Sequence, residues 1–338
     1  MNLAVNTPPK SPIETLLHLA KADMAVVDDI IRARMQSPVG MIPDLAAHLV
    51  EAGGKRLRPL LTIASAHLCH YEGQQHYKLA AAVEFIHSAT LLHDDVVDAS
   101  DKRRGRKAAN LIWGNAPSIL VGDFLFARAF NLMVETGSMQ ALGILSNAAS
   151  IIAEGEVQQL AGLRDIDMTL ASYMDVISAK TATLFSAAAE VAPVLAASGE
   201  TKQKALKTYG LELGLAFQIV DDVLDYGGLE SALGKSVGDD FREGKMTLPV
   251  ILAYAQAVKQ KDTDTIAFWQ RVIVTHRQTP DDLEYAIALL KNTGALAESI
   301  ERAQTHVQAA TDALSCFEDS VWRRALIDLA GFVVSRVS

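Results

Sequence analysis

The chain has 338 residues, enough for one large domain or two ordinary ones with a sizeable core. Its formal charge of -9, from 31 Lys and Arg against 40 Asp and Glu, excludes a global cationic field for nucleic acid or an anionic membrane surface. Hydrophobic residues make up 50% but aromatic residues only 6%, which favours packed helices over a β-sandwich, so we expect an all-α protein. Cys69 and Cys316 have neither metal-ligand spacing nor a disulfide framework, which favours a reducing, cytoplasmic compartment.

The N-terminal segment, residues 1–12, has no charged region followed by an apolar run, so we expect a disordered start and no secretion signal. Apolar residues recur at helical spacing through the rest of the chain, with no convincing strand series and no interdomain linker, which predicts a single helical domain over residues 13–338. The most apolar stretch, residues 181–198, is broken by Glu190 and Pro193. It is predicted to be a buried core helix and not a transmembrane segment.

Residues 53–59 read Gly-Gly-Lys-Arg-Leu-Arg-Pro and precede a predicted helix. The glycines free the backbone, while Lys55, Arg56 and Arg58 place positive charge at a helix N-terminus, where cations normally oppose the dipole. These charges become favourable if an anion binds there, because free amide groups and cations then act together. The spacing differs from that of a P-loop, and we interpret the segment as an anion-binding turn.

A cluster of acidic residues, Asp94-Asp95-Val96-Val97-Asp98, ends an apolar helical pattern. Asp94 and Asp98 lie about one turn apart on one helix face, so they can share hard cations such as Mg²⁺. Taken alone, the cluster is equally compatible with a solvated helix end. The basic run that follows, residues 102–107 (KRRGRK), places guanidinium groups that suit a diphosphate beside it, although ordinary counter-charges in a solvated loop are the alternative.

A second acidic cluster, Asp221-Asp222-Val223-Leu224-Asp225, also follows an apolar helical pattern. Two such clusters in one site would repel each other unless cations lay between them, so the pair favours a metal site. The segment that follows, residues 227–245, mixes glycines with acidic and basic residues. This composition is more typical of a functional loop than of a tether.

Further polar residues fall on the helices of these clusters. Gln218 precedes the second cluster by three residues, and His87 lies about two turns before the first, so each can donate near phosphate oxygens. For His87, a satisfied core histidine is the alternative. Lys180, followed by Thr181, is a single charge in a strongly apolar helix, which favours a buried anion partner.

Together, the heptad at Gly53, both acidic clusters, Arg103-Arg104-Gly105 and Gly234-Lys235-Ser236 resemble the trans-isoprenyl diphosphate synthase family in order and spacing. The resemblance covers residues 16–336 and is strongest to the long-chain octaprenyl and decaprenyl diphosphate synthases. It implies an all-α isoprenoid synthase fold, a helical bundle around a deep central cavity, with the acidic clusters facing each other across its mouth. It also implies Mg²⁺ as cofactor and a homodimer.

The resemblance assigns roles to individual residues. Metal binding would fall to Asp94, Asp98 and Asp221, with Asp95, Asp222 and Asp225 in support. The catalytic group would consist of Asp94, Asp95, Asp98, Asp221, Asp222 and Lys180. Isopentenyl diphosphate would be held by Lys55, Arg58, His87 and Arg104. The allylic diphosphate would be held by Arg103, Lys180, Thr181, Gln218 and Lys235, with Lys245 closing over the same site.

The implied reaction is the sequential condensation of isopentenyl diphosphate with an allylic diphosphate such as farnesyl or geranyl diphosphate. Ionising the allylic carbon–oxygen bond releases a diphosphate, whose growing negative charge Mg²⁺ and the basic residues would stabilise. The double bond of isopentenyl diphosphate then attacks the cation, and a proton is lost. The expected product is an octaprenyl or decaprenyl diphosphate, a precursor of the ubiquinone side chain.

Product length is expected to depend on small residues before the first acidic cluster, Ser88, Ala89 and Thr90, which leave room for a hydrocarbon tail. Ala89→Phe is predicted to shorten the product; close helix packing is the alternative reason for small residues there. One departure from the family pattern is Ala108, where relatives often carry threonine. The change removes a hydroxyl contact but no charge.

Other protein classes remain open at this stage. A non-catalytic subunit of a heteromeric synthase or a shorter-chain farnesyl or geranylgeranyl synthase shares the motifs, although complete motifs argue against the former. A terpene cyclase also ionises allylic diphosphates, but the second acidic cluster and the Gly53 heptad favour elongation. A di-iron site is suggested by residues 84–87, Glu-Phe-Ile-His, yet the chain has no second Glu-x-x-His.

Overall fold

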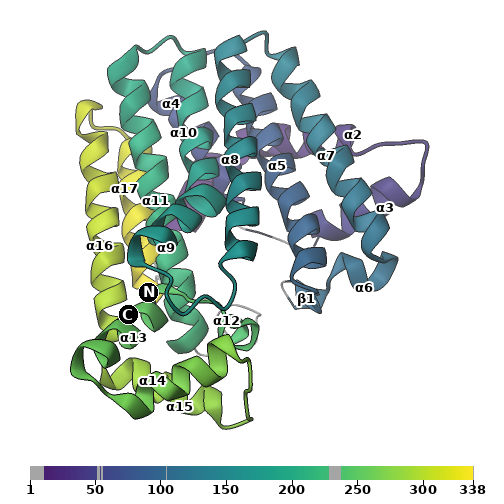
Figure 1. Cartoon of the computed structure of the whole chain (residues 1–338). Coiled ribbons are helices and arrows are strands. Elements are labelled where there is room, and N and C mark those ends of the chain that lie inside the picture. Colours follow the sequence, from purple (N-terminus) through teal and green to yellow (C-terminus); the bar gives the residue numbers. More distant parts are fainter. Residues whose placement is uncertain (1–10, 52–53, 55, 104, 228–236, 338) are drawn as a thin grey trace, which may run out of the picture.

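The computed structural model describes residues 11–51, 54, 56–103, 105–227 and 237–337. Within this part the molecule is almost entirely helical (Figure 1), so the expected all-α fold is confirmed. Its one pair of strands is an antiparallel hairpin of two residues each, β1 (Lys102–Arg103) and β2 (Arg106–Lys107). Three predicted substrate-binding residues lie outside the described residues: Lys55, Arg104 and Lys235.

The helices up to the middle of the chain are α1 (Pro12–Leu19), α2 (Lys21–Arg34), α3 (Met41–Glu51), α4 (Leu57–Leu68), α5 (Gln75–Val97), α6 (Ala109–Trp113), α7 (Asn115–Glu135), α8 (Met139–Ala161) and α9 (Leu170–Ile177). The later ones are the π-helix η1 (Ser178–Ala182), α10 (Thr183–Leu195), α11 (Glu200–Gly227), α12 (Asp239–Glu243), α13 (Leu248–Gln260), α14 (Thr263–Trp269), the π-helix η2 (Gln270–Val274), α15 (Asp282–Asn292), α16 (Ala295–Ala313), the 3₁₀-helix η3 (Leu314–Cys316) and α17 (Val321–Ser335).

The first helix starts inside the segment that was expected to be disordered. Ser11 is the N-cap of α1, and a capping box with Glu14 satisfies backbone N–H groups at the helix start. Pro12 occupies the first turn, where its missing N–H costs nothing. These two residues therefore belong to the fold, and α1 packs against α17 near the other end of the chain (Figure 1).

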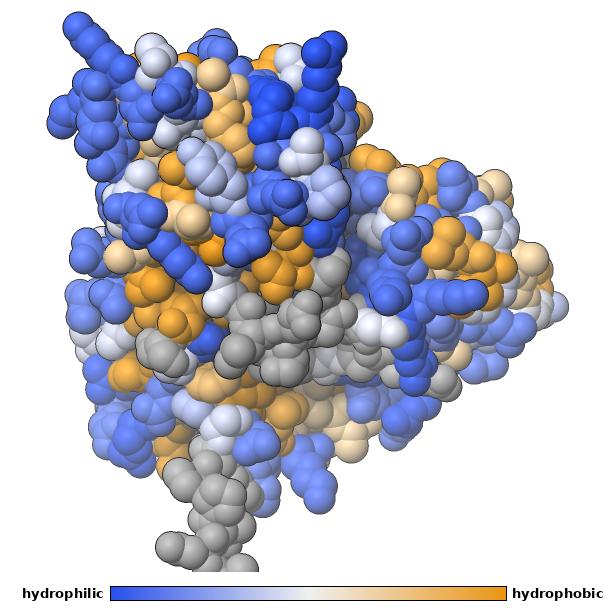
Figure 2. Space-filling model, turned by 90° about the horizontal axis from the view of Figure 1, so that it is seen from below, coloured by the Kyte–Doolittle hydropathy of each residue, from blue (hydrophilic) through white to orange (hydrophobic). Residues whose placement is uncertain are grey.

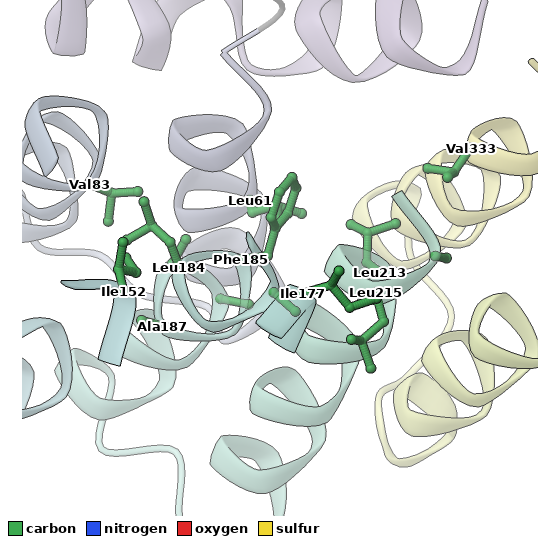
Figure 3. Close-up of a cluster of buried hydrophobic side chains, with 14 of the residues drawn as sticks. Leu61, Val83, Ile152, Ile177, Leu184, Phe185, Ala187, Leu213, Leu215 and Val333 are labelled. Carbon is green, nitrogen blue, oxygen red and sulfur yellow. The ribbon is translucent and has the colours of Figure 1, made fainter. Parts of the chain in front are cut away.

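The long helices α5, α7, α8, α10 and α11 lie side by side in the body of the molecule, with α16 and α17 flanking α11 (Figure 1). The core is centred on α10, which packs against α4, α5, α8 and α11. Figure 3 shows Leu184 of α10 beside Val83 and Ile152, and Phe185 beside Leu61. The prediction of a buried helix in this stretch is confirmed, because the residues of α10 from its second to its eleventh are buried.

Glycines let α11 lie unusually close to α10. A Cβ built on Gly214 would lie 2.5 Å from the Cα of Ala182, and one on Gly210 would lie 2.4 Å from the carbonyl oxygen of Phe185. The atoms met at these short distances belong to the backbone, so no side-chain rotation would relieve the clash. The close approach brings Thr181, at the start of this contact, within reach of α11.

The helix α7 is long and apolar enough to cross a membrane by length and composition, with 39% of its most apolar window buried. This is weak evidence, because core helices of many proteins have the same character. Its buried side packs against α5, while Ile119, Leu120 and Val134 are exposed. The lobe at the right of Figure 2, on the side where Figure 1 places α6 and α7, shows apolar residues among hydrophilic ones.

Candidate active site

The two acidic clusters line the same cavity, which has a volume of about 720 Å³. Asp94 and Asp98 come from the end of α5, and Asp221, Asp222 and Asp225 from the end of α11. The basic and polar predicted residues that line it with them are Arg58, His87, Thr90, Arg103, Lys180, Thr181, Gln218 and Lys245. The fold therefore gathers predicted site residues that are up to 187 positions apart in sequence, from Arg58 to Lys245, around one space.

Asp94 of the first acidic cluster is strongly desolvated. Burial raises the pKa of Asp94 to about 7; Lys180 and Arg103 oppose this shift, and Glu156 and Asp98 add to it. The Nζ atom of Lys180 lies 2.7 Å from Oε2 of Glu156 and 3.8 Å from Oδ2 of Asp94. Without another cation in the cavity, these carboxylates repel one another.

Asp95 is the member of the first cluster that does not line the cavity. Its carboxylate is 1% exposed and accepts hydrogen bonds from Nε and Nη2 of Arg103, at 2.9 and 2.5 Å. The side chain of Asn110 donates to its backbone oxygen at 2.9 Å. Asp95 therefore orients Arg103, which does line the cavity, and its carboxylate in this structure neutralises that cation.

Lys180 is placed by a π-bulge. The π-helix η1 interrupts the helical hydrogen bonding between α9 and α10, and such bulges are frequent at functional sites. Gly155 of α8 allows the close approach, since a Cβ there would lie 2.7 Å from the Cβ of Ala179 and 3.0 Å from the backbone nitrogen of Lys180. The bulge thus holds the ammonium group beside Glu156, one residue further along α8.

A chain of hydrogen bonds links η1 to the second acidic cluster. The hydroxyl of Thr181 donates to Oε1 of Gln218 at 2.9 Å, and Nε2 of Gln218 donates to Oδ1 of Asp222 at 2.8 Å. The hydroxyl of Tyr173 donates to Oδ2 of Asp222 at 2.6 Å. Burial raises the pKa of Asp222 to about 7, while the two donated hydrogen bonds lower it.

Asp225 holds the start of α12 against the end of α11. Its two carboxylate oxygens accept from the backbone N–H groups of Asp239 and Asp240, at 3.2 and 3.0 Å. At the other end of α12, Nζ of Lys245 lies 3.9 Å from Oδ2 of Asp98 and also pairs with Glu243. Burial alone would lower the pKa of Lys245, but the surrounding carboxylates raise it above its ordinary value.

Arg58 and His87, both assigned to isopentenyl diphosphate by resemblance, lie together. Nη1 of Arg58 is 3.2 Å from Nε2 of His87, and its guanidinium carbon lies 4.3 Å from the centre of the Phe185 ring. Arg56 precedes α4 with a left-handed φ of 46° and pairs with Asp28 of α2. Its charge is therefore partly committed to holding the chain at the start of α4.

The small residues proposed to set product length differ in position. Thr90 lines the cavity, on the same face of α5 as His87 and Asp94. Ala89 is fully buried in the hydrophobic core, and Ser88 is 7% exposed; neither lines the cavity. Of the small and apolar residues of α5, Thr90 and its neighbour Leu91 therefore line the cavity.

Several cavity residues were not predicted from the sequence: Glu84, Glu156, Tyr173, Asp239, Asp240, Glu243 and Arg336. Glu156 carries a weaker form of the signal that singled out Lys180, because α8 is largely apolar but also contains Glu154. Tyr173 has no comparable signal, because its partner Asp222 is distant in sequence. Glu84 was noted only as part of a di-iron pattern.

Carboxylates outnumber Lys and Arg among the described residues that line the cavity, and oxygen-rich sites of this kind suit Mg²⁺. No group of three His, Cys, Asp or Glu side chains in the described part of the chain is close enough to hold a metal by itself. This fits an ion that takes one or two carboxylates from the protein and further oxygens from substrate phosphates. Asp94, Asp98 and Asp221 all line the cavity and could supply the protein ligands.

The fold and the cavity together define a class: an all-helical protein whose cavity is lined by two acidic clusters, by basic side chains and by apolar side chains. The chain belongs to the polyprenyl synthetase family, which it matches over residues 40–290, and is a prenyltransferase. It is 43% identical over 324 residues to octaprenyl diphosphate synthase of Escherichia coli, covering 96% of this chain and 99% of that protein.

Solved structures show the same fold over almost the whole chain. A polyprenyl synthase from Caulobacter crescentus, complexed with calcium and isoprenyl diphosphate, superposes with a TM-score of 0.92 at 53% identity, covering 98% of this chain and 100% of the other. A decaprenyl diphosphate synthase from Rhodobacter capsulatus gives a TM-score of 0.92 at 51% identity, with coverages of 97% and 100%. The family predicted from the motifs is thereby confirmed.

Proposed function

We propose that this chain is a Mg²⁺-dependent long-chain trans-polyprenyl diphosphate synthase that condenses isopentenyl diphosphate with an allylic diphosphate, farnesyl or geranyl diphosphate. The observation that carries the proposal is the convergence of both acidic clusters on one cavity that also holds Lys180, Arg58 and His87. The likeness to octaprenyl and decaprenyl diphosphate synthases supports a long-chain product. The product would serve as the precursor of a ubiquinone side chain in the cytoplasm.

We assign Lys180, Thr181 and Gln218 to the allylic diphosphate, and Arg58 and His87 to isopentenyl diphosphate. All five residues line the cavity, which supports the assignment. Bound Mg²⁺ would supply positive charge that stabilises the departing diphosphate. Apolar residues of the cavity, among them Leu91, Ile177 and Phe217, would keep water from the allylic cation.

The chemical step itself needs no protein nucleophile. The allylic carbon–oxygen bond breaks with its electron pair leaving on the diphosphate, and the double bond of isopentenyl diphosphate attacks the resulting cation. A new carbon–carbon bond forms, and the departing diphosphate is the proposed acceptor of the lost proton. The cationic side chains therefore contribute by stabilising charge that develops in the transition state.

Product analysis tests the proposal directly. The purified protein, supplied with farnesyl and isopentenyl diphosphates and Mg²⁺, should yield prenyl diphosphates that, after dephosphorylation, have the mass of octaprenol or decaprenol. EDTA should abolish turnover and added Mg²⁺ should restore it. Condensation that persists after complete metal removal would contradict the metal requirement. Binding of both substrates without condensation would favour a non-catalytic subunit, and C15 or C20 products would favour a shorter-chain synthase.

We also propose that two copies of the chain form a homodimer through α6, α7 and α8. These helices pack against one another and expose large apolar side chains: Leu111, Ile112, Ile119, Leu120, Val157 and Leu160. Such a concentration of exposed apolar residues is unusual on a surface that faces water permanently. A second copy would bury them in a self-complementary interface.

A further inference from the structure

The last helix contributes a cation to the cavity that no motif predicted. Leu329, Phe332, Val333 and Arg336 of α17 all line the cavity, and their spacing places them on one face of the helix. The first three are apolar, so the face ends in a single positive charge. Arg336 is the C-cap residue of α17.

The guanidinium group of Arg336 is positioned by an aromatic ring, but one of its hydrogen-bond donors has no acceptor in the described part of the chain. Its central carbon lies 5.2 Å from the centre of the Phe217 ring, a cation–π arrangement that fixes its position. Its Nη1 atom is buried and has no hydrogen-bond partner among the described residues. A buried donor without an acceptor is costly, so an acceptor that arrives from outside would be bound favourably.

A second arginine contacts the same pair of aromatic rings. Phe185 and Phe217 are in contact, with ring centres 5.6 Å apart. Arg58 lies over Phe185 as Arg336 lies over Phe217. The two rings therefore carry one guanidinium group each, both on the cavity wall.

A helix-dipole role explains the position of Arg336 less well. A cation at a helix C-terminus is favourable, but the same interaction is available to a side chain that points into solvent. Arg336 is instead partly buried, which lowers its pKa, and the carboxylate of Asp221 acts on it in the opposite sense. Burying a charged group costs free energy, and a bound anion beside the guanidinium group would offset that cost.

We infer that Arg336 is a further substrate-binding residue and that it donates to the diphosphate of isopentenyl diphosphate, together with Arg58. This rests on the proposed function, because the assignment of Arg58 to isopentenyl diphosphate comes from the family resemblance. The shared aromatic pair places Arg336 with Arg58 and not with Lys180, whose partners are Glu156 and Asp94. Isopentenyl diphosphate and the allylic substrate both present a diphosphate group to Arg336. The experiment below distinguishes which of the two substrates it binds.

The test compares Arg336→Gln and Arg336→Lys with Arg324→Gln, an exposed arginine of the same helix that pairs with Asp319 at the surface. Loss of a charge-assisted hydrogen bond should raise KM for isopentenyl diphosphate about tenfold or more in Arg336→Gln, with KM for farnesyl diphosphate unchanged. Arg336→Lys should recover part of the loss, and Arg324→Gln should match the wild type. Equal melting temperatures would show that folding is unaffected.

Calorimetric titration with isopentenyl diphosphate alone gives the same comparison without turnover. Weaker binding by Arg336→Gln than by the wild type is expected. Unchanged affinity, or a rise in KM confined to farnesyl diphosphate, would overturn the assignment. If the wild type made no polyprenyl product, the proposed function would fail, whereas the titration would still decide whether Arg336 binds isopentenyl diphosphate.

Discussion

Thr90 presents a small side chain to the cavity about one helical turn before Asp94. Its hydroxyl donates to the backbone oxygen of His87 at 2.8 Å, so the side chain is held against its own helix. Thr90→Phe should fill the space beside α5 and shorten the main product by several isoprene units. Mass analysis of dephosphorylated products measures the change.

Ala89→Phe is the matched comparison for Thr90→Phe. The sequence alone predicted that Ala89→Phe would shorten the product. Ala89 is fully buried in the core, so a phenylalanine there must displace packed neighbours. We expect it to lower the free energy of unfolding by about 1–3 kcal/mol. Shortening by Ala89→Phe but not by Thr90→Phe would contradict the cavity wall described for α5.

Tyr173 supports the second acidic cluster through its hydrogen bond to Asp222. Tyr173→Phe removes one of two side-chain donors to a buried carboxylate, which should cost about 1–3 kcal/mol and lower kcat/KM about tenfold. Tyr77→Phe is a matched control, since Tyr77 donates to Asp23 at 2.8 Å outside the cavity. Both variants should be less stable in denaturant titrations. An equal loss of kcat/KM in both would show that stability alone explains the effect.

These residues mark how far the sequence could locate the site. Clusters of aspartates after apolar helices identify Asp94 and Asp221 because the pattern is local and repeated. The sequence could not tell that Asp95 turns inward to Arg103, since the choice depends on the hairpin and on Asn110. Tyr173 and Arg336 were missed because their partners come from other helices.

At the scale of helices, Gly214 sets the distance between α11 and the end of η1, where α10 begins. Gly214→Ala adds one methyl group that would lie 2.5 Å from the Cα of Ala182, so the helices must separate. The free energy of unfolding should fall by about 1–3 kcal/mol, and the Thr181–Gln218 hydrogen bond should weaken. Gly143→Ala in α8 is the control, because nothing lies within 4 Å of its Cβ. That variant should be about 0.5–1 kcal/mol more stable than the wild type.

His76, near the start of α5, should make the free energy of unfolding depend on pH. It is 3% exposed, its Nδ1 has no hydrogen-bond partner in the described part of the chain, and it contacts the rings of Tyr71 and Tyr77. Burial lowers the pKa of His76 from 6.5 to about 4; Asp23 opposes the shift and His67 adds to it. The folded protein therefore takes up the proton at lower pH than the unfolded chain does.

The free energy of unfolding should accordingly be highest above pH 6.5 and fall as the pH drops from 6.5 to about 4. We expect this histidine to contribute about 1–3 kcal/mol to the fall. His76→Leu should flatten the pH dependence in that window, whereas His18→Leu, at an exposed position of α1, should not. Denaturant titrations at several pH values measure it. A wild-type slope retained by His76→Leu would rule out this histidine as the cause.

For the whole molecule, the helical class followed from composition and periodicity, because long runs of apolar residues at helical spacing admit few other structures. The arrangement of the helices did not follow in the same way. The close packing of α10 depends on glycines of α11, and the position of η1 depends on Gly155 of α8. In sequence these glycines read as ordinary helix residues. The motifs led to the right family, and the family supplied the cavity that periodicity alone could not.

The apolar surface of α6, α7 and α8 is a property of the whole molecule. A single copy of the chain leaves this surface exposed, and nothing in the described part of that copy covers it. Leu120 is 66% exposed on α7, the helix that is also apolar enough to cross a membrane. If a second copy covers this surface, Leu120→Glu should convert a dimer into a monomer, because an interface core does not accommodate an unpaired carboxylate. Light scattering coupled to gel filtration measures the mass.

Val258→Glu is the control, since Val258 is 49% exposed on α13, away from these helices. It should leave the mass at twice 36.4 kDa, as in the wild type. Flotation with phospholipid vesicles tests the alternative that a membrane covers this surface. A protein whose α7 enters a membrane would float with the vesicles, and Leu120→Glu would stop it floating. A wild type that is monomeric and floats would replace the dimer with a membrane contact. A wild type that is dimeric and stays in solution would assign this face to the second copy.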